Sequence, residues 1–179
     1  MFLPLAVAPV AAPAQVLLTQ EEALRLVFPE PAEIERRTAY LDAERLAELE
    51  EASGTEQPST IITYYVGREG DRPLGVAYFD AHRVRTLPEV LMVHVEPDGR
   101  VGRIEVLRFA EPQEYLAPAG WLDRFEGRRL DGDLDDRNAV AGITGATLTS
   151  RAIEQAVRRT LALHAWLDPL STDSGDGTQ

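Results

Sequence analysis

The chain has 179 residues and a formal charge of −12, from 18 basic and 30 acidic side chains, and all 18 basic residues are arginine. This length suits one domain that buries about 70% of the surface of its unfolded chain. Apolar residues make up 44% of the chain, which excludes a disordered protein. The absence of cysteine excludes disulfides, thiolate zinc sites, cysteine-ligated iron–sulfur clusters and c-type haem. The net negative charge argues against a nucleic-acid partner, because phosphate binding needs a basic surface.

The first 14 residues are apolar and carry no charge. They include Pro4, Pro9 and Pro13 and are too short for a membrane-spanning helix. Ala12-Pro13-Ala14 has the small-x-small form of a signal-peptidase site, although the basic segment that should precede it is missing. Two interpretations stay open, a secretory signal peptide and an apolar tail, and the cleavage pattern favours the signal peptide. The chain has no run of about 18 apolar residues, so the sequence predicts no membrane-spanning helix.

Two helices are predicted before the first strand. Residues Thr19–Phe28 begin with a capping box, since Thr19 is followed three residues later by Glu22. Two prolines end this helix, and Asp42–Ala52 predicts the second one. Residues 21–56 hold 11 acids against 4 arginines, which is typical of a solvated helical face.

The pattern then changes to strands that pair as two hairpins. Thr60–Val66 and Leu74–Phe79 are rich in β-branched and aromatic residues and predict the first hairpin. Val90–Val95 and Val101–Leu107 flank the turn sequence Pro97-Asp98-Gly99 and predict the second.

Helices return towards the C-terminus. A short helix is expected within Tyr115–Phe125, and Arg151–Leu167 predicts a long amphipathic helix that Pro169 ends. Helices at both ends of a run of hairpins predict an α+β fold, with a mostly antiparallel sheet flanked by N-terminal helices and a C-terminal helix. We expect a signal or apolar tail over 1–14, a helical adjunct over 15–56, a main domain over 57–168 and a disordered tail over 169–179.

The segment 141–150, with the sequence AGITGATLTS, is the most informative for chemistry. Gly142 and Gly145 permit backbone angles and close approaches that other residues resist. Four hydroxyl groups follow within seven residues, and the last helix begins directly afterwards. The free amides and positive dipole of a helix start bind phosphate well. A simple N-cap at Thr149 or Ser150 is the alternative interpretation.

Thr144-Gly145-Ala146-Thr147, followed by Leu148-Thr149-Ser150 and a helix, resembles the flavinylation motif of the FMN-binding domain family. That family includes peripheral subunits of the Rnf and Na⁺-translocating NADH:quinone reductase complexes. The resemblance extends over residues 60–163. It includes Ala110-Glu111-Pro112, which is similar to the family's Glu-Thr-Pro loop near the flavin but lacks the threonine. Trp121, Leu122, Phe125 and Gly127 resemble the segment that follows.

The resemblance implies an extracytoplasmic electron carrier with FMN held by a phosphoester to Thr147. It implies a separate flavin transferase for maturation and a membrane-bound redox partner, and it favours an electron-transfer protein over a stand-alone enzyme. The FMN-binding residues that the resemblance points to are Gly142, Thr144, Gly145, Ala146, Thr147, Leu148, Thr149, Ser150, Glu111 and Trp121. Pro112 and Tyr115 are further candidates for the walls around the ring.

One departure from the family pattern leaves alternatives open. The family usually has an aspartate three residues before the motif's first Thr or Ser, and this chain has Ala141 there. If that aspartate guides the transferase, the chain binds FMN non-covalently, or it is a binding or regulatory module that has lost the cofactor.

The three histidines predict no metal site. His82 stands among charged residues of an expected loop, His94 alternates with valines on a strand, and His164 lies late in a helix where the dipole favours a cation. We interpret each as structural.

Overall fold

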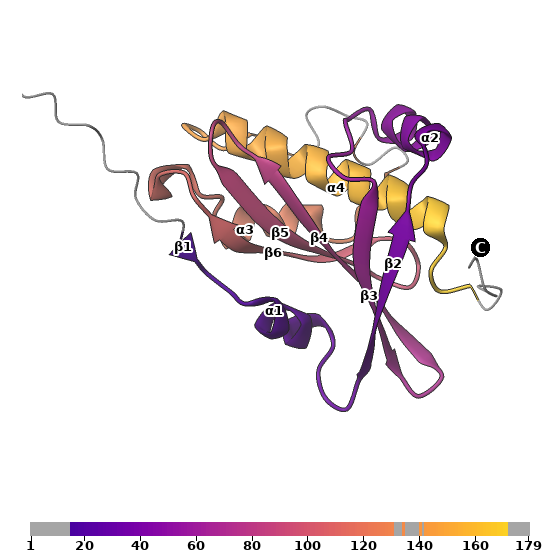
Figure 1. Ribbon diagram of the computed structural model, residues 1–179. Helices are drawn as coiled ribbons and strands as arrows, with labels where there is room; N and C mark the ends of the chain where they lie inside the picture. The colour runs from indigo at the N-terminus through magenta and orange to yellow at the C-terminus, as the bar shows by residue number, and fades with distance from the viewer. Residues whose placement is uncertain (1–14, 131–133, 135–139, 141, 172–179) are drawn as a thin grey trace, which may run out of the picture.

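A computed structural model of the chain describes residues 15–130, 134, 140 and 142–171. It has an α+β fold in which helices cover the two faces of one antiparallel sheet (Figure 1), as the sequence predicted. The N-terminal segment 1–14, Ala141 and the tail beyond Ser171 lie outside the described residues, so the interpretations that rest on them stay predictions.

Both predicted N-terminal helices form, and the first has the expected capping box. Helix α1 spans Gln20–Val27, and its capping box joins Thr19 and Glu22 in both directions. Helix α2 spans Ala43–Ser53, with the Asp42 side chain accepting from the amide of Arg45. Gly54 ends α2 in the left-handed conformation at φ 66°, which a residue without a Cβ adopts readily.

The sheet has six strands in the order β1-β6-β5-β4-β3-β2, and every neighbouring pair is antiparallel. The predicted hairpins form its centre but their strands are longer than expected. Their bounds are Ile61–Glu69 for β3, Arg72–Arg83 for β4, Pro88–Val95 for β5 and Val101–Phe109 for β6.

The two edge strands were not predicted from the sequence. Strand β1 is only Gln15–Val16, which pairs with the end of β6. Strand β2 spans Glu33–Tyr40 and pairs with β3 along its whole length. Its sequence EIERRTAY carries charges on both faces and none of its residues is buried, so it lacks the apolar alternation that marks a strand. The span 15–56 therefore contributes a strand to the sheet as well as two helices, while the division into domains stays a prediction.

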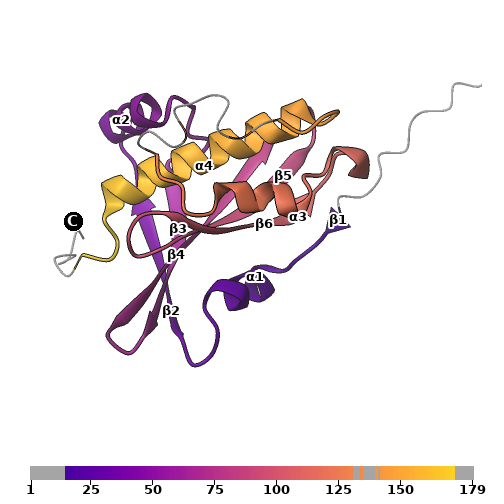
Figure 2. The same cartoon turned by 180° about the vertical axis from the view of Figure 1, so that it is seen from behind.

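Helix α4, Thr147–Leu167, lies across one face of the sheet together with α2 and the short helices after β6 (Figures 1 and 2). Those short helices are η1 at Gln113–Tyr115, α3 at Ala119–Leu122 and η2 at Asp123–Phe125, in place of the one short helix expected. The main core lies between α4 and the sheet, where Ile153 and Val157 share a cluster with Leu91 and Val93.

Helix α1 covers the opposite face with a second, smaller core. Ala23, Leu24 and Phe28 pack with Ala77 and Met92 of the central strands. Phe28 lies directly against the backbone of β3, because a Cβ built on Gly67 would stand 2.2 Å from its Cδ1 atom. Within the described part of the chain, no helix has the length and apolar character needed to cross a membrane.

His94 of β5 is buried, and His164 of α4 is half-buried. His94 lies against the Leu74 carbonyl oxygen, with its Nε2 at 3.1 Å, and His164 Nδ1 lies 2.9 Å from the hydroxyl of Tyr78. Burial lowers the pKa of His164 to about 4, so this imidazole is neutral at pH 7. The sequence had placed a site that favours a cation there, and burial outweighs the helix dipole.

We expect Gly67→Ala to destabilise the chain, because the new methyl group would overlap the Phe28 ring. Overpacking of this kind costs about 1–3 kcal/mol of unfolding free energy. Gly120→Ala in α3 is the matched control, since a Cβ there meets nothing within 4 Å. Urea unfolding followed by circular dichroism measures both, and equal stability of the two variants would contradict the packing of α1 on β3.

Candidate functional site

The glycine and threonine motif forms the turn that leads into α4. Gly145 has φ +85°, a left-handed conformation that favours glycine. Helix α4 begins at Thr147, four residues earlier than the sequence predicted, and the first intrahelical bond joins the Ser150 amide to the Ala146 carbonyl. Ala146 occupies the N-cap position and has no side chain that could cap the helix. The first amides of α4 therefore keep their hydrogen-bonding capacity for a ligand at the positive end of the dipole.

The hydroxyl groups of the motif divide between the surface and the interior. Thr144 and Thr147 are exposed, whereas Thr149 and Ser150 are buried. Ser150 Oγ donates to the Thr147 carbonyl at 3.0 Å, so it closes the first turn of the helix and does not act as the N-cap. Of the four hydroxyl groups, the two exposed ones are open to an incoming group.

A small pocket of about 170 Å³ opens beside Thr147. Its walls combine the start of α4 with two residues that lie far away in the sequence: Gly145, Ala146, Thr147, Leu148, Thr149, Arg85 and Tyr115. The Arg85 guanidinium carbon lies 5.6 Å from the centre of the Tyr115 ring, within the range of a cation–π contact. The pocket thus presents a hydroxyl, a cation, an aromatic ring and free helix amides together.

Glu111 fixes the loop that carries Arg85. Its Oε1 atom accepts the backbone N–H groups of Arg85, Thr86 and Leu87, at 3.2, 2.8 and 2.9 Å. Burial disfavours the charged form of Glu111, but these three donors and the Arg85 charge outweigh burial, so the pKa of Glu111 lies below its ordinary value. The sequence proposed Glu111 as a wall of the flavin site, whereas in the structure it shapes the loop beside the pocket.

The other predicted site residues lie close to the pocket or behind it. Gly142 precedes the turn, and a Cβ there would lie 3.5 Å from Ser150 Oγ. Pro112 is the N-cap of the short helix η1 that ends at Tyr115. Trp121 is buried in the main core, where its ring meets Phe125 edge to face at 5.2 Å, and it does not line this pocket. The binding of FMN by these residues stays a prediction.

Arg85 is the pocket residue that the sequence did not predict. It stands in the loop 84–87 between β4 and β5, which reads only as a connection between strands. Its place depends on Glu111, which is 26 residues away in the chain, and no local pattern indicates such a contact. An arginine next to a strand end is common, so nothing in the sequence singled it out.

Part of the site lies in a segment that matches a known family of cofactor-binding domains. Residues 88–162 match the model of the FMN-binding domain family. The matched segment contains Glu111, Tyr115 and the whole motif around Thr147, while Arg85 stands just before it.

Among curated proteins, the chain is similar to a subunit of the Na⁺-translocating ferredoxin:NAD⁺ oxidoreductase complex of Acetobacterium woodii. The two are 24% identical over 157 residues, which cover 82% of this chain and 74% of the relative. No solved structure is significantly similar to the chain.

We expect Glu111→Ala to loosen the loop 84–87, because three amides lose one charged acceptor. A loss of about 1–3 kcal/mol in unfolding free energy follows from leaving such donors unsatisfied. The pKa of Glu111 is lowered in the folded chain, so its contribution to the stability of the wild type is fully present above the unfolded pKa of about 4.3. That contribution is lost as the pH falls through the pKa of Glu111 in the folded chain. Hydrogen exchange of amides 85–87 reports the loosening.

Glu114→Ala is the control for that experiment, since Glu114 is an exposed acid three residues further along. Its unfolding free energy should stay within about 0.5 kcal/mol of the wild type. If both variants leave amides 85–87 equally protected, Glu111 does not hold the loop.

Proposed function

We propose that this chain is an electron-carrying flavoprotein subunit with FMN attached through a phosphoester to the Thr147 hydroxyl. The observation that carries the proposal is the position of Thr147, an exposed threonine at the first residue of α4 that lines a pocket with Arg85 and Tyr115. The match of residues 88–162 to the FMN-binding domain family, and the similarity to a subunit of an oxidoreductase complex, support an electron-transfer function.

The residues around Thr147 suit a phosphate group. A phosphate ester on the Thr147 oxygen would stand at the positive end of the α4 dipole, within reach of the free amides of the first turn. Ala146 leaves that end of the helix without a side-chain cap, so no side chain of the motif competes for these amides at the N-cap position. Arg85, which also lines the pocket, adds a full positive charge.

The pocket is too small to enclose the whole cofactor. Its volume of about 170 Å³ lies below the ~300–1,000 Å³ of sites that bury a small-molecule ligand. Tyr115 and the exposed Leu148 offer apolar surface on which a flat ring can rest. FMN supplies one- and two-electron redox chemistry when bound. A covalent bond to Thr147 keeps an open site loaded, and an open site leaves the ring accessible to a redox partner.

The relative supports a proposal about the redox partner of this chain. The complex of that relative translocates Na⁺, which requires a membrane, so we propose that this chain meets a membrane-bound redox partner. We further propose that a flavin transferase attaches the FMN outside the cytoplasm, in agreement with a signal peptide over residues 1–14. The chain then acts as a component of a redox complex and not as a stand-alone enzyme.

Co-expression with a flavin transferase tests the attachment. We expect the intact mass to rise by FMN minus water, and we expect in-gel flavin fluorescence after denaturation. Thr147→Ala should abolish both, because it removes the hydroxyl that forms the ester, whereas Thr147→Ser should retain them in part.

Thr144→Ala is the matched control, an exposed threonine of the same motif that should leave the adduct in place. An adduct that persists in Thr147→Ala would refute the assignment. Yellow protein that releases its flavin on denaturation would instead indicate non-covalent FMN. Protein that stays colourless would indicate a module without cofactor, the outcome that Ala141 in the motif's aspartate position would explain.

Arg85→Gln should lower the midpoint potential of the bound FMN, because a nearby cation stabilises the more negative reduced flavin. A charge effect of roughly 1–2 kcal/mol corresponds to about 20–40 mV for a two-electron couple. Arg103→Gln is the control, since Arg103 on β6 stands opposite His94 on β5, at the end of β5 away from the Arg85 loop. Spectroelectrochemical titration measures both, and an unchanged potential in Arg85→Gln would exclude Arg85 from the flavin site.

A further inference from the structure

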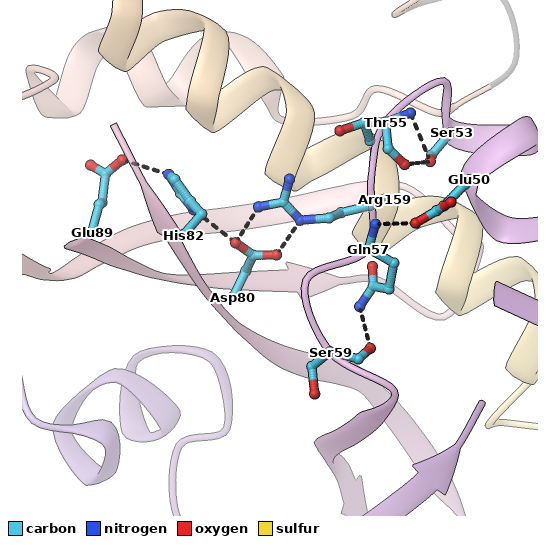
Figure 3. A network of polar contacts seen from close by, with 9 residues as sticks. All are labelled: Glu50, Ser53, Thr55, Gln57, Ser59, Asp80, His82, Glu89 and Arg159. Atoms are coloured by element: carbon cyan, nitrogen blue, oxygen red, sulfur yellow. Dashed lines mark hydrogen bonds and ion pairs between the residues drawn. The ribbon is translucent and has the colours of Figure 1, made fainter. Parts of the chain in front are cut away.

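A network of four ionisable side chains is buried between α4 and the sheet (Figure 3). Arg159 of α4 forks onto Asp80 of β4, with two N–O distances of 2.5 Å. His82 Nδ1 lies 2.8 Å from the same carboxylate, and its Nε2 lies 3.0 Å from Glu89 Oε2 on β5. The four side chains are between 0% and 8% exposed. The sequence had placed His82 in a loop, whereas it belongs to β4 and forms a cross-strand pair with Glu89.

The geometry of this network requires a proton between His82 and Glu89. Asp80 accepts from Arg159 and His82, which outweigh its burial and hold its pKa below the ordinary value, so Nδ1 of His82 is the donor to Asp80. A neutral imidazole with its hydrogen on Nδ1 has a bare lone pair on Nε2. That lone pair would face the lone pairs of an ionised Glu89 at 3.0 Å. One further proton, on Nε2 or on the carboxyl group, converts this repulsion into a hydrogen bond.

Glu89 has little else to stabilise a negative charge. Its side chain is fully buried, and its Oε1 atom has no hydrogen-bond partner in the described part of the chain. Burial raises the pKa of Glu89 above its ordinary value. Burial also disfavours charged His82, but the two carboxylates outweigh it and raise the pKa of His82. Loss of the shared proton would therefore leave an uncompensated negative charge in the interior.

The pair stands at the base of the loop that carries Arg85. His82 lies near the end of β4 and Glu89 near the start of β5, and only Arg83 and Pro88 pair beyond them. Glu111 holds the amides of this loop from the other side. Separation of His82 from Glu89 would open the hairpin end directly below the loop.

We propose that His82 and Glu89 form a proton-dependent positioning pair, which keeps the Arg85 loop closed on the Thr147 pocket while it holds one proton and releases the loop when that proton is lost. The functional role of this pair rests on the proposed flavin function, because Arg85 acts on the group bound at Thr147. The proton-dependent contact itself needs no flavin.

The neighbouring charges and the solvent leave the direction of the effect unchanged. Asp80 on β4 and Glu89 on β5 contact His82 directly, and Arg159 on α4 binds the Asp80 carboxylate. Glu56 and Arg83 stand across a cleft of about 500 Å³ that His82 and Arg159 also line, which gives water a route to the imidazole. Both raised pKa values mean that the folded chain binds the proton more tightly than the unfolded chain. The contact between His82 and Glu89 is complete below the unfolded histidine pKa of about 6.5. It is lost as the pH rises through the pKa of His82 in the folded chain.

Hydrogen exchange of amides 85–87 in the full-length chain without flavin tests the proposal. After correction for intrinsic exchange rates, we expect their protection to fall about tenfold per pH unit above the folded pKa of His82. Nitrogen-15 shifts of the His82 ring measure that pKa in the same samples. Glu89→Gln should abolish the pH dependence, because its side-chain amide donates to Nε2 without an extra proton. Glu105→Gln, which alters a partly exposed ion pair on β6, should behave as the wild type.

Protection of amides 85–87 that stays flat while the His82 ring deprotonates would overturn the proposal. The same would follow if Glu89→Gln retained the wild-type slope. The wild-type titration stands even if Glu89→Gln does not fold. Because neither measurement contains flavin, failure of Thr147 to accept FMN would leave this result unaffected, so the two proposals fail separately.

Discussion

The ion pair between Arg159 and Asp80 determines where α4 lies along the sheet. This buried charged contact joins the helix to the second half of β4, and removal of one partner from such a pair costs about 3–5 kcal/mol. Arg159 lies twelve residues after Thr147, which is ~18 Å along the helix axis. With Arg159 over Asp80 and the apolar face of α4 packed on the sheet, the start of the helix lies beside the loop between β4 and β5. The site around Thr147 is a consequence of that register.

Three segments that are distant in sequence meet at this helix start. The loop 84–87 supplies Arg85, the segment after β6 supplies Glu111 and Tyr115, and the turn before α4 supplies Thr147. The chain as a whole carries a charge of −12, yet the pocket combines an arginine with the positive end of a helix. Much of the acidic charge stands in residues 21–56, outside these three segments. The local field at Thr147 is therefore suited to an anion despite the acidic chain around it.

Elements with strong local rules were predictable from the sequence. The capping box of Thr19 placed α1 almost to the residue, and the predicted span of α2 differs from the observed one by one residue at each end. Strand β2 escaped prediction because an edge strand exposed on both faces needs no apolar alternation. The start of α4 was placed too late because Ser150 has the chemistry of an N-cap, although its hydroxyl bonds inward to Thr147. Within the site, the motif was visible in the sequence, whereas the Arg85–Glu111 and His82–Glu89 contacts depend on tertiary structure.

We propose that Thr147, the first turn of α4 and the Arg85 loop form one FMN site. The decisive experiment is a crystal structure of the flavinylated chain. We expect a phosphate ester on Thr147 that accepts hydrogen bonds from the first amides of α4 or from Arg85, with the flavin ring against Tyr115. A phosphate that points into solvent, away from both the helix start and Arg85, would contradict it.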